Sequence, residues 1–347
     1  MNKNTRDLLL GHFRKYPLLQ AEDIFKYLFQ SAFGCEHLVS DPSAALNYIK
    51  KEREMSVSSP TLDELDGEYT RVHISCLAPE TLARLFCLSA KKEDGLASLE
   101  AKLEVAKELV ANGDLPLDGE DFSRKLEAWR QAGYPALHHS DAFREAYRPA
   151  YRVIANKYAK FLSIFAEIDG LLANGNAIIA IEGGAASGKT TLSGIFAEVY
   201  DCNVFHMDDF FLRPSQRTPE RLREVGGNVD RERFLSEVLL PLRRRETVTF
   251  RPFDCSLWDL GAPVSVDPAP LSVVEGSYSM HPLLAPHYDG AVFLDIDPAL
   301  QRARIEKRNS PPMAKRFFEE WIPMENAYFE GMRVKERCGV HIPVSDS

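Results

Sequence analysis

One short stretch, IEGGAASGKTT from Ile181 to Thr191, constrains the fold of this chain more than any other. It follows the apolar run AIIA and precedes LSGIFAEVY, whose apolar residues recur at helical spacing. The pattern Gly-x-x-x-x-Gly-Lys-Thr, from Gly183 to Thr190, predicts a phosphate-binding loop when a strand precedes it and a helix follows. Glycines let the backbone curl so that amide groups face phosphate oxygens, and the helix adds its positive N-terminal end.

Each residue of this loop is a candidate contact for a nucleotide: Gly183, Gly184, Ala185, Ala186, Ser187, Gly188, Lys189, Thr190 and Thr191. Lys189 is expected to reach the outer phosphates of ATP, and the Thr190 hydroxyl is expected to ligate Mg²⁺. The alternative is a glycine-rich turn between a strand and a helix that binds nothing.

Residues 171–347 alternate between strand and helix patterns. Four short runs rich in Val, Ile and Phe, namely AIIAIEG, NVFHMD, LSVVEGS and AVFLDID, are each followed by a loop or a helical segment. This alternation predicts an α/β domain, a parallel sheet with helices on both faces. Ligands of such sheets collect at the carboxyl ends of the strands, where the phosphate loop lies.

Residues 1–170 are predicted to form a separate, mostly α-helical domain whose role the pattern leaves unknown. Apolar residues recur at helical spacing in several segments, most clearly in residues 96–110. Only residues 69–77 alternate like a strand. A long helix is expected from Tyr151 to Ala173, burying Ile154, Tyr158, Phe161 and Phe165.

Composition excludes several classes of protein. The 347 residues carry a net charge of −9, so no excess of Lys and Arg marks a nucleic-acid surface. The six cysteines form no C-x-x-C pair, which argues against a disulfide framework or a zinc ribbon. No signal peptide or membrane-length apolar run is evident, so we expect a cytoplasmic protein that does not contact a membrane. The sequence leaves open whether the protein forms a homo-oligomer.

Carboxylates follow two of the predicted strands. Asp208 and Asp209 end the second strand, where a carboxylate can accept the proton of an attacking hydroxyl. Glu275 follows an apolar strand, as a metal-holding carboxylate would. The alternatives are a helix cap or solvated turn for the aspartates, and a loop-entry glutamate before Gly276.

In this context the sequence resembles the uridine kinase and phosphoribulokinase group of P-loop kinases, from about residue 177 to 343. GGAASGKTT is similar to its phosphate loop, and HMDDFF to the element whose first aspartate activates the substrate hydroxyl, which makes Asp208 the candidate base. GGNVDRERF and RPFDCSLWD resemble acceptor-binding segments, which implies that Asp230, Phe253 and Asp254 contact the substrate.

The resemblance also extends to VVEGSYS and to DIDPALQRARIEKR, the start of an arginine-bearing lid. Arg304 and Arg308 match the lid arginines, whereas Gln301 replaces the first of them. The alternative interpretation of these two arginines is that they lie on a solvent-exposed helix face that also carries Glu306. The departures fall on the acceptor side, since Phe253 replaces a tyrosine and the segment after Asp230 is shorter.

The sequence therefore predicts an ATP- and Mg²⁺-dependent kinase with Lys189, Asp208, Arg304 and Arg308 as catalytic residues. Its substrate is expected to be a hydroxyl group of a small metabolite, a nucleoside first, with pantothenate, glycerate or a sugar phosphate as alternatives. The rival is a regulatory P-loop ATPase switch that phosphorylates no metabolite. Asp208 separates the two, because a switch needs a water-positioning group but no acceptor pocket built from Asp230 and Asp254.

Polar groups also cluster in the N-terminal half. Cys35, Glu36 and His37 carry metal-ligating groups, but their spacing matches no closed zinc site. His138, His139 and Arg144 are hypothesised to contact a ligand or to cover the acceptor side. Helix-end hydrogen bonds or core histidines are the alternative for these residues.

Overall fold

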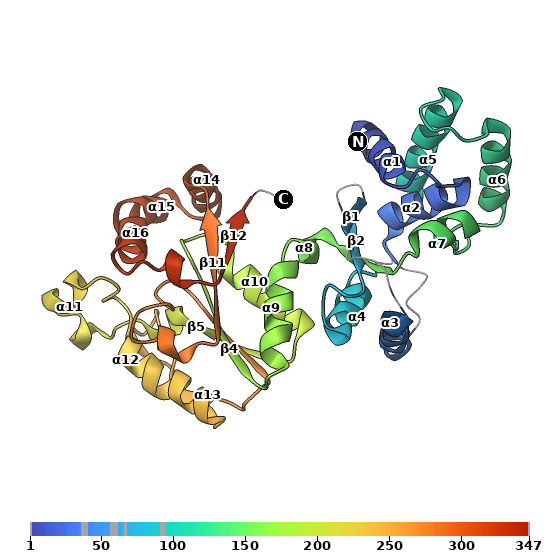
Figure 1. The fold of residues 1–347 in the computed structure, drawn as a ribbon. Helices are drawn as coiled ribbons and strands as arrows, with labels where there is room; N and C mark the ends of the chain where they lie inside the picture. Colours follow the sequence, from blue (N-terminus) through green and yellow to red (C-terminus); the bar gives the residue numbers. More distant parts are fainter. Residues whose placement is uncertain (1, 36–40, 56–61, 66–67, 91–94, 346–347) are drawn as a thin grey trace. The chain divides into compact units, whose positions relative to one another are not determined.

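The computed structural model describes residues 2–35, 41–55, 62–65, 68–90 and 95–345 (Figure 1). Contacts divide the chain into two compact units, Met1–Ala166 and Glu167–Ser347. The predicted boundary at residues 170 and 171 lies close to this division. Among the described residues, no helix is long and apolar enough to cross a membrane. The six cysteines are free thiols.

The first unit is mostly helical and carries one small antiparallel sheet. Its strands are β1 (Leu62–Leu65), β2 (Tyr69–His73) and β3 (Tyr151–Ala155), in the order β1-β2-β3. Its helices are α1 (Asn2–Lys15), α2 (Ala21–Phe33), α3 (Pro42–Met55), α4 (Pro79–Leu88), α5 (Leu96–Ala111), α6 (Gly119–Gln131), α7 (Asp141–Tyr147) and α8 (Asn156–Ala159). Residues 36 and 37 lie outside the described part, so the Cys35–His37 cluster stays without a structural account.

The predicted helix from Tyr151 to Ala173 is wrong over residues 151–155, and it is interrupted between α8 (Asn156–Ala159) and α9 (Leu162–Leu172). Residues 151–155 form β3, which pairs antiparallel with β2 so that Tyr69 faces Ala155 and His73 faces Tyr151. Helix resumes as α8 and, separately, as α9 (Leu162–Leu172). The β-branched Val153 and Ile154 suit a buried strand, and pairing with β2 overrides the helical spacing. The predicted buried residues Ile154, Tyr158, Phe161 and Phe165 are indeed buried.

The second unit is built on a parallel sheet, as predicted, and this sheet has five strands. Its strands are β4 (Ala177–Gly183), β5 (Cys202–His206), β10 (Leu271–Glu275), β11 (Gly290–Ile296) and β12 (Val340–Val344), in the order β12-β11-β4-β10-β5. The registers place Glu275 of β10 beside both Ile181 of β4 and His206 of β5. The phosphate loop, the aspartate pair and Glu275 therefore follow three adjacent strands at one edge of the sheet.

The remaining elements surround this sheet (Figure 1). The helices are α10 (Lys189–Val199), α11 (Pro219–Arg223), α12 (Arg231–Phe234), α13 (Leu240–Arg244), α14 (Pro298–Arg308), α15 (Pro311–Arg316) and α16 (Ile322–Gly331). Short 3-10 or π segments are η2 (Met207–Phe210), η3 (Pro214–Gln216), η4 (Leu235–Leu239), η5 (Ala285–His287), η6 (Phe317–Trp321) and η7 (Lys335–Arg337). Two hairpins pair β6 (Val248–Phe250) with β9 (Val264–Val266), and β7 (Phe253–Asp254) with β8 (Asp259–Leu260).

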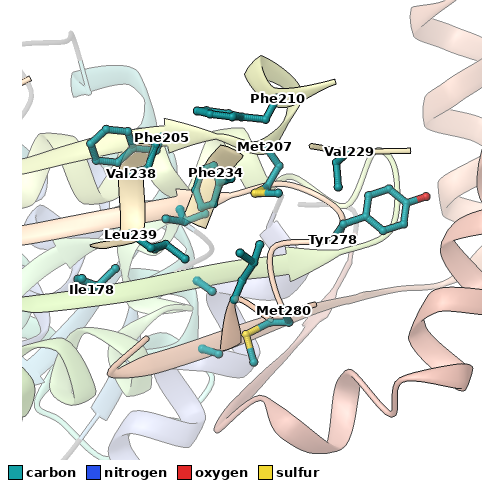
Figure 2. Packing of buried hydrophobic residues seen from close by; sticks show 14 of the residues in the cluster. Ile178, Phe205, Met207, Phe210, Val229, Phe234, Val238, Leu239, Tyr278 and Met280 are labelled. Carbon is teal, nitrogen blue, oxygen red and sulfur yellow. The ribbon is translucent and has the colours of Figure 1, made fainter. Parts of the chain in front are cut away.

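Side chains of β4 alternate between the two faces of the sheet. Ile178 and Ala180 join an apolar cluster with Phe234, Val238 and other residues of the α12–α13 segment (Figure 2). Ile179 points to the opposite face, because successive strand residues alternate, and there it lies near Gly290 and Leu171 of α9. Helices thus cover both faces, which buries β4 along its whole length and fixes the start of the phosphate loop.

Candidate active site

The phosphate loop has the backbone geometry that its glycines predict. Gly183 has φ 147° and Gly188 has φ 99°, a region that side chains disfavour. A Cβ on Gly183 would lie 2.7 Å from the Leu294 carbonyl oxygen, so this position also excludes any side chain sterically. After Gly188 the chain enters α10, whose first amides have no intrahelical acceptor and are free for phosphate oxygens.

Lys189 lies over the loop that it follows. Its Nζ donates to the carbonyl oxygens of Gly183 at 2.8 Å and of Gly184 at 3.1 Å. Ser187 has a buried hydroxyl that finds no hydrogen-bond partner. An orphaned hydroxyl, unpaired amides and a lysine together fit a bound phosphate group, which would supply the missing acceptors.

Thr190 and Glu275 are brought together as the sequence predicts. The Thr190 hydroxyl donates to Glu275 Oε1 at 3.1 Å, and His206 Nδ1 contacts the same oxygen at 2.6 Å. Hydroxyl and carboxylate oxygens are the ligands that Mg²⁺ prefers, and this ion needs only one or two protein ligands beside nucleotide phosphates. The donor set therefore fits Mg²⁺, provided that His206 releases Glu275 on binding.

His206 is a site residue that the sequence analysis did not single out. Its hydrogen bond to Glu275, and that residue's charge, raise the pKa of the imidazole against the effect of burial. Burial would raise the pKa of Glu275, but His206, Lys189 and Thr190 outweigh it and hold the pKa below its ordinary value. The two side chains thus form an ion pair at the end of β5 and β10.

Asp208 lies in η2, directly after β5, and its side chain is accessible to solvent. Protein atoms nevertheless displace much of its water, which raises the pKa of the carboxyl; Glu275 and Asp209 add to the rise, while Lys189 and His206 oppose it. No other described side chain donates a hydrogen bond to it. Asp208 is therefore a carboxylate with a free oxygen beside the phosphate loop, as a base requires.

Two of the predicted acceptor residues also serve as local caps. Asp230 accepts from the Arg233 amide at 3.1 Å, which begins α12, and from Gln216 Nε2 at 2.7 Å. Asp254 accepts from the amide and the hydroxyl of Ser256 in the turn between β7 and β8. Both carboxylates thus have protein partners before any substrate arrives.

Phe253 is brought next to the element that carries the predicted base. Its ring lies 6.1 Å from that of Phe211, the residue after η2, and 6.3 Å from that of Trp258. Arg233 was not foreseen: its guanidinium stacks 4.4 Å from the Phe210 ring and donates to the Asp209 carbonyl oxygen at 3.1 Å. An aromatic wall and a cation therefore stand beside Asp208 and Asp209.

The two lid arginines differ in their positions. Arg304 of α14 donates to the Ala186 carbonyl oxygen at 3.2 Å, which places it at the phosphate loop. Arg308 ends α14, and its guanidinium lies 5.9 Å from the Phe317 ring; within the described part of the chain it makes no hydrogen bond to the loop. Gln301, which replaces an arginine, donates to the Ala185 carbonyl oxygen at 2.9 Å and braces the loop.

Two buried glutamates hold the phosphate loop and escaped the sequence analysis. Glu182 accepts from the amides of Gly183 at 3.0 Å and Met280 at 3.1 Å, and from the Tyr328 hydroxyl at 2.9 Å. Glu325 of α16 accepts from the Ala185 amide at 2.8 Å and from the Ser277 hydroxyl at 2.5 Å. The only signal in the sequence was Glu182's position at the end of an apolar strand.

Comparisons with known proteins find similarity in structure only. No family model and no curated protein matches the sequence. A possible uridine kinase from Bacillus stearothermophilus is 20% identical over 52% of this chain and 99% of its own, with a TM-score of 0.38. A protein from Silicibacter sp. TM1040, described provisionally as a fructose transport system kinase, is 22% identical over 51% and 97%, with a TM-score of 0.43. At these values the likeness concerns the fold of about half the chain.

Proposed function

We propose that this protein is a kinase that transfers the terminal phosphoryl group of ATP to a hydroxyl group of a small metabolite. The observation that carries the proposal is the gathering of three groups on adjacent strands. Lys189 follows β4, Glu275 with its partner Thr190 ends β10, and Asp208 follows β5. Phosphate binding, metal binding and a base are the three parts that such a transfer requires.

Each of these side chains has a role that its chemistry supports. Asp208 accepts the proton of the attacking hydroxyl, and its raised pKa makes it a stronger base when it is ionised. Lys189 and Arg304 offset the charge that develops on the transferred group. Thr190 and Glu275 would hold Mg²⁺, which supplies further charge neutralisation when bound.

The acceptor that we favour is a nucleoside or another ribose-like compound. Trp258 is 55% exposed and Phe211 is half-buried, and both rings lie against the buried Phe253, so they supply a surface on which a base could stack. Arg233 is the observation that favours the alternative, an acidic acceptor such as glycerate or a sugar phosphate. Its Nη1 is buried without a hydrogen-bond partner, whereas its Nε is paired with Glu237 at 3.4 Å.

A metabolite panel with the full-length protein and γ-labelled ATP tests the proposal. Nucleosides, pantothenate, glycerate and sugar phosphates are each incubated with Mg²⁺-ATP, and the label is followed into products and into inorganic phosphate. Label in one class of hydroxyl compound supports the kinase and names the acceptor. ATP hydrolysis that no compound changes would instead support the regulatory switch.

A further inference from the structure

The first unit contains a network of buried polar side chains that the proposed kinase chemistry does not use. His139 Nδ1 bonds Asp23 Oδ1 at 2.7 Å, and His139 Nε2 bonds the Tyr151 hydroxyl at 2.7 Å. The network continues through Gln30, whose Oε1 accepts from Tyr151 at 3.4 Å and from Arg71 Nε at 2.8 Å. All these residues lie within residues 1–166, in α2, β2, β3 and the segment before α7.

Arg71 is the unusual member of this network. It is 2% exposed, the largest fully buried side chain described, and no described carboxylate lies within ion-pair distance of it. Its guanidinium carbon lies 5.2 Å from the centre of the Tyr27 ring and 4.6 Å from that of Tyr151. Nη1 reaches only His12 Nε2, at 3.4 Å, and Nη2 has no hydrogen-bond partner. A buried guanidinium with an unpaired donor destabilises the folded state unless an anion pairs with it.

The nearby carboxylates are already engaged elsewhere. Asp23 accepts from His139, from the Ser140 amide and hydroxyl, and from the Gln20 amide. Asp63, opposite Arg71 in the register of β1 and β2, bonds Lys15 and the Tyr16 hydroxyl. Neither supplies an acceptor to Nη2.

The neighbouring basic groups respond to this charge. Burial lowers the pKa of His139 to about 4 and that of Lys26 to about 8, and in both the charge of Arg71 contributes to the fall. Burial and Arg71 likewise lower the pKa of His12. The charge of Arg71 thus acts on three neighbouring basic groups, and at His139 and Lys26 the carboxylate of Asp23 opposes it. The unpaired Nη2 of Arg71 is the donor that remains for an anion.

We propose that Arg71 is the centre of an oxyanion-binding site in the N-terminal unit, which takes a phosphate or carboxylate group of a small molecule. The Nη1 and Nη2 edge of the guanidinium donates to the anion, while Gln30 and the two tyrosine rings hold the guanidinium in place. Nη2 is shielded from solvent, so the anion enters when the surrounding segments open locally.

Hydrogen exchange of the full-length protein, followed by mass spectrometry, tests this site with inorganic phosphate as the probe. About 20 mM phosphate fills a site with a Kd of about 1 mM and should slow exchange in residues 21–33 and 69–73 about 20-fold relative to chloride at equal ionic strength. Acetate in place of phosphate shows whether a carboxylate suffices. Protection of residues 183–191 by phosphate reports the P-loop separately and serves as an internal control.

Two variants make the test specific. Gln30→Glu keeps the side-chain shape but places a carboxylate against Arg71, so it should fold and lose the phosphate response of residues 69–73. Arg71→Gln should lose it as well, while Arg124→Gln, at an exposed arginine paired with Asp121, should keep it. The proposal is overturned if phosphate and acetate protect these segments no more than chloride does, or if the protection persists in Gln30→Glu.

Discussion

Glu182 is the buried residue whose ionisation has the clearest consequence for stability. Burial raises its pKa from 4.5 to about 7, although the Gly183 and Met280 amides, the Tyr328 hydroxyl and the charge of Lys189 oppose the rise. A carboxyl whose pKa is higher in the folded state binds its proton more tightly there. Its contribution to stability is therefore greatest below pH 4.5 and is lost as the pH rises to about 7.

Glu182→Gln removes this titration. The difference in free energy of unfolding between wild type and the variant should fall by about 2 to 3 kcal/mol between about pH 5 and pH 8, since one unit of pKa shift corresponds to about 1.4 kcal/mol. Urea unfolding at both pH values measures it. A difference that is independent of pH would mean that Glu182 keeps an ordinary pKa.

The sequence alone identified the site residues that belong to a local sequence motif. Lys189 and Thr190 are fixed by the spacing of the glycines, and the adjacency of Glu275 follows from the order of the strands. His206 and Glu325 could not be found this way. Their partners Glu275 and Ala185 are 69 and 140 residues away in the chain, and only tertiary packing brings them together.

At the scale of elements, the strand-to-loop turn after β4 depends on two glycines for different reasons. A Cβ at Gly183 would press on the Leu294 backbone at 2.7 Å, whereas one at Gly188 meets no atom within 4 Å and is disfavoured only by φ 99°. Gly188→Ala should therefore cost about 1 to 2 kcal/mol of unfolding free energy, the usual strain of this region. Gly183→Ala should cost at least about 1 kcal/mol more, because backbone must also shift.

Urea unfolding of the two variants checks this order. Gly194→Ala is the matched control, since Gly194 lies inside α10 with open space around its Cβ position. The free energy of unfolding of that variant should rise by up to about 1 kcal/mol, because alanine has a higher helix propensity than glycine. Equal decreases in the free energy of unfolding for Gly183→Ala and Gly188→Ala would contradict the steric explanation.

The sequence predicted β2, β4, β5, β10 and β11 but missed other strands, among them β1, β3 and β12. A buried parallel strand reads as a continuous apolar run bounded by turns, which few other structures produce. Tyr151–Ala155 instead has apolar spacing that suits either a helix or a strand, and its partner β2 lies about 80 residues away. Val340–Val344 contains a proline and occupies the sheet edge, so its apolar signal is weak.

On the scale of the whole molecule, the contacts described for the candidate active site join residues 182–328, all of which belong to the second unit. A chain that begins at Leu162 keeps all of α9, including the bond between Asp169 and the Tyr200 hydroxyl. We expect it to bind Mg²⁺-ATP with a Kd within about threefold of the full-length value, a difference below about 1 kcal/mol.

Isothermal titration of both proteins measures this affinity, and circular dichroism establishes that the shorter chain is folded. Acceptor KM is measured alongside, because a higher KM in the shorter chain would assign acceptor recognition to the N-terminal unit. A folded short chain without ATP binding would show that the first unit contributes to the donor site.

Asp208 is the residue on which the proposed reaction depends, and a comparison of two aspartate variants measures its role. Turnover and ATP affinity are measured for wild type, Asp208→Asn and the neighbouring Asp209→Asn with the best acceptor of the panel. We predict that Asp208→Asn lowers kcat about 100-fold or more and leaves the Kd for ATP nearly unchanged, the usual scale for loss of a general base. Asp209→Asn should change kcat by less than about tenfold. Wild-type turnover in Asp208→Asn would contradict the account.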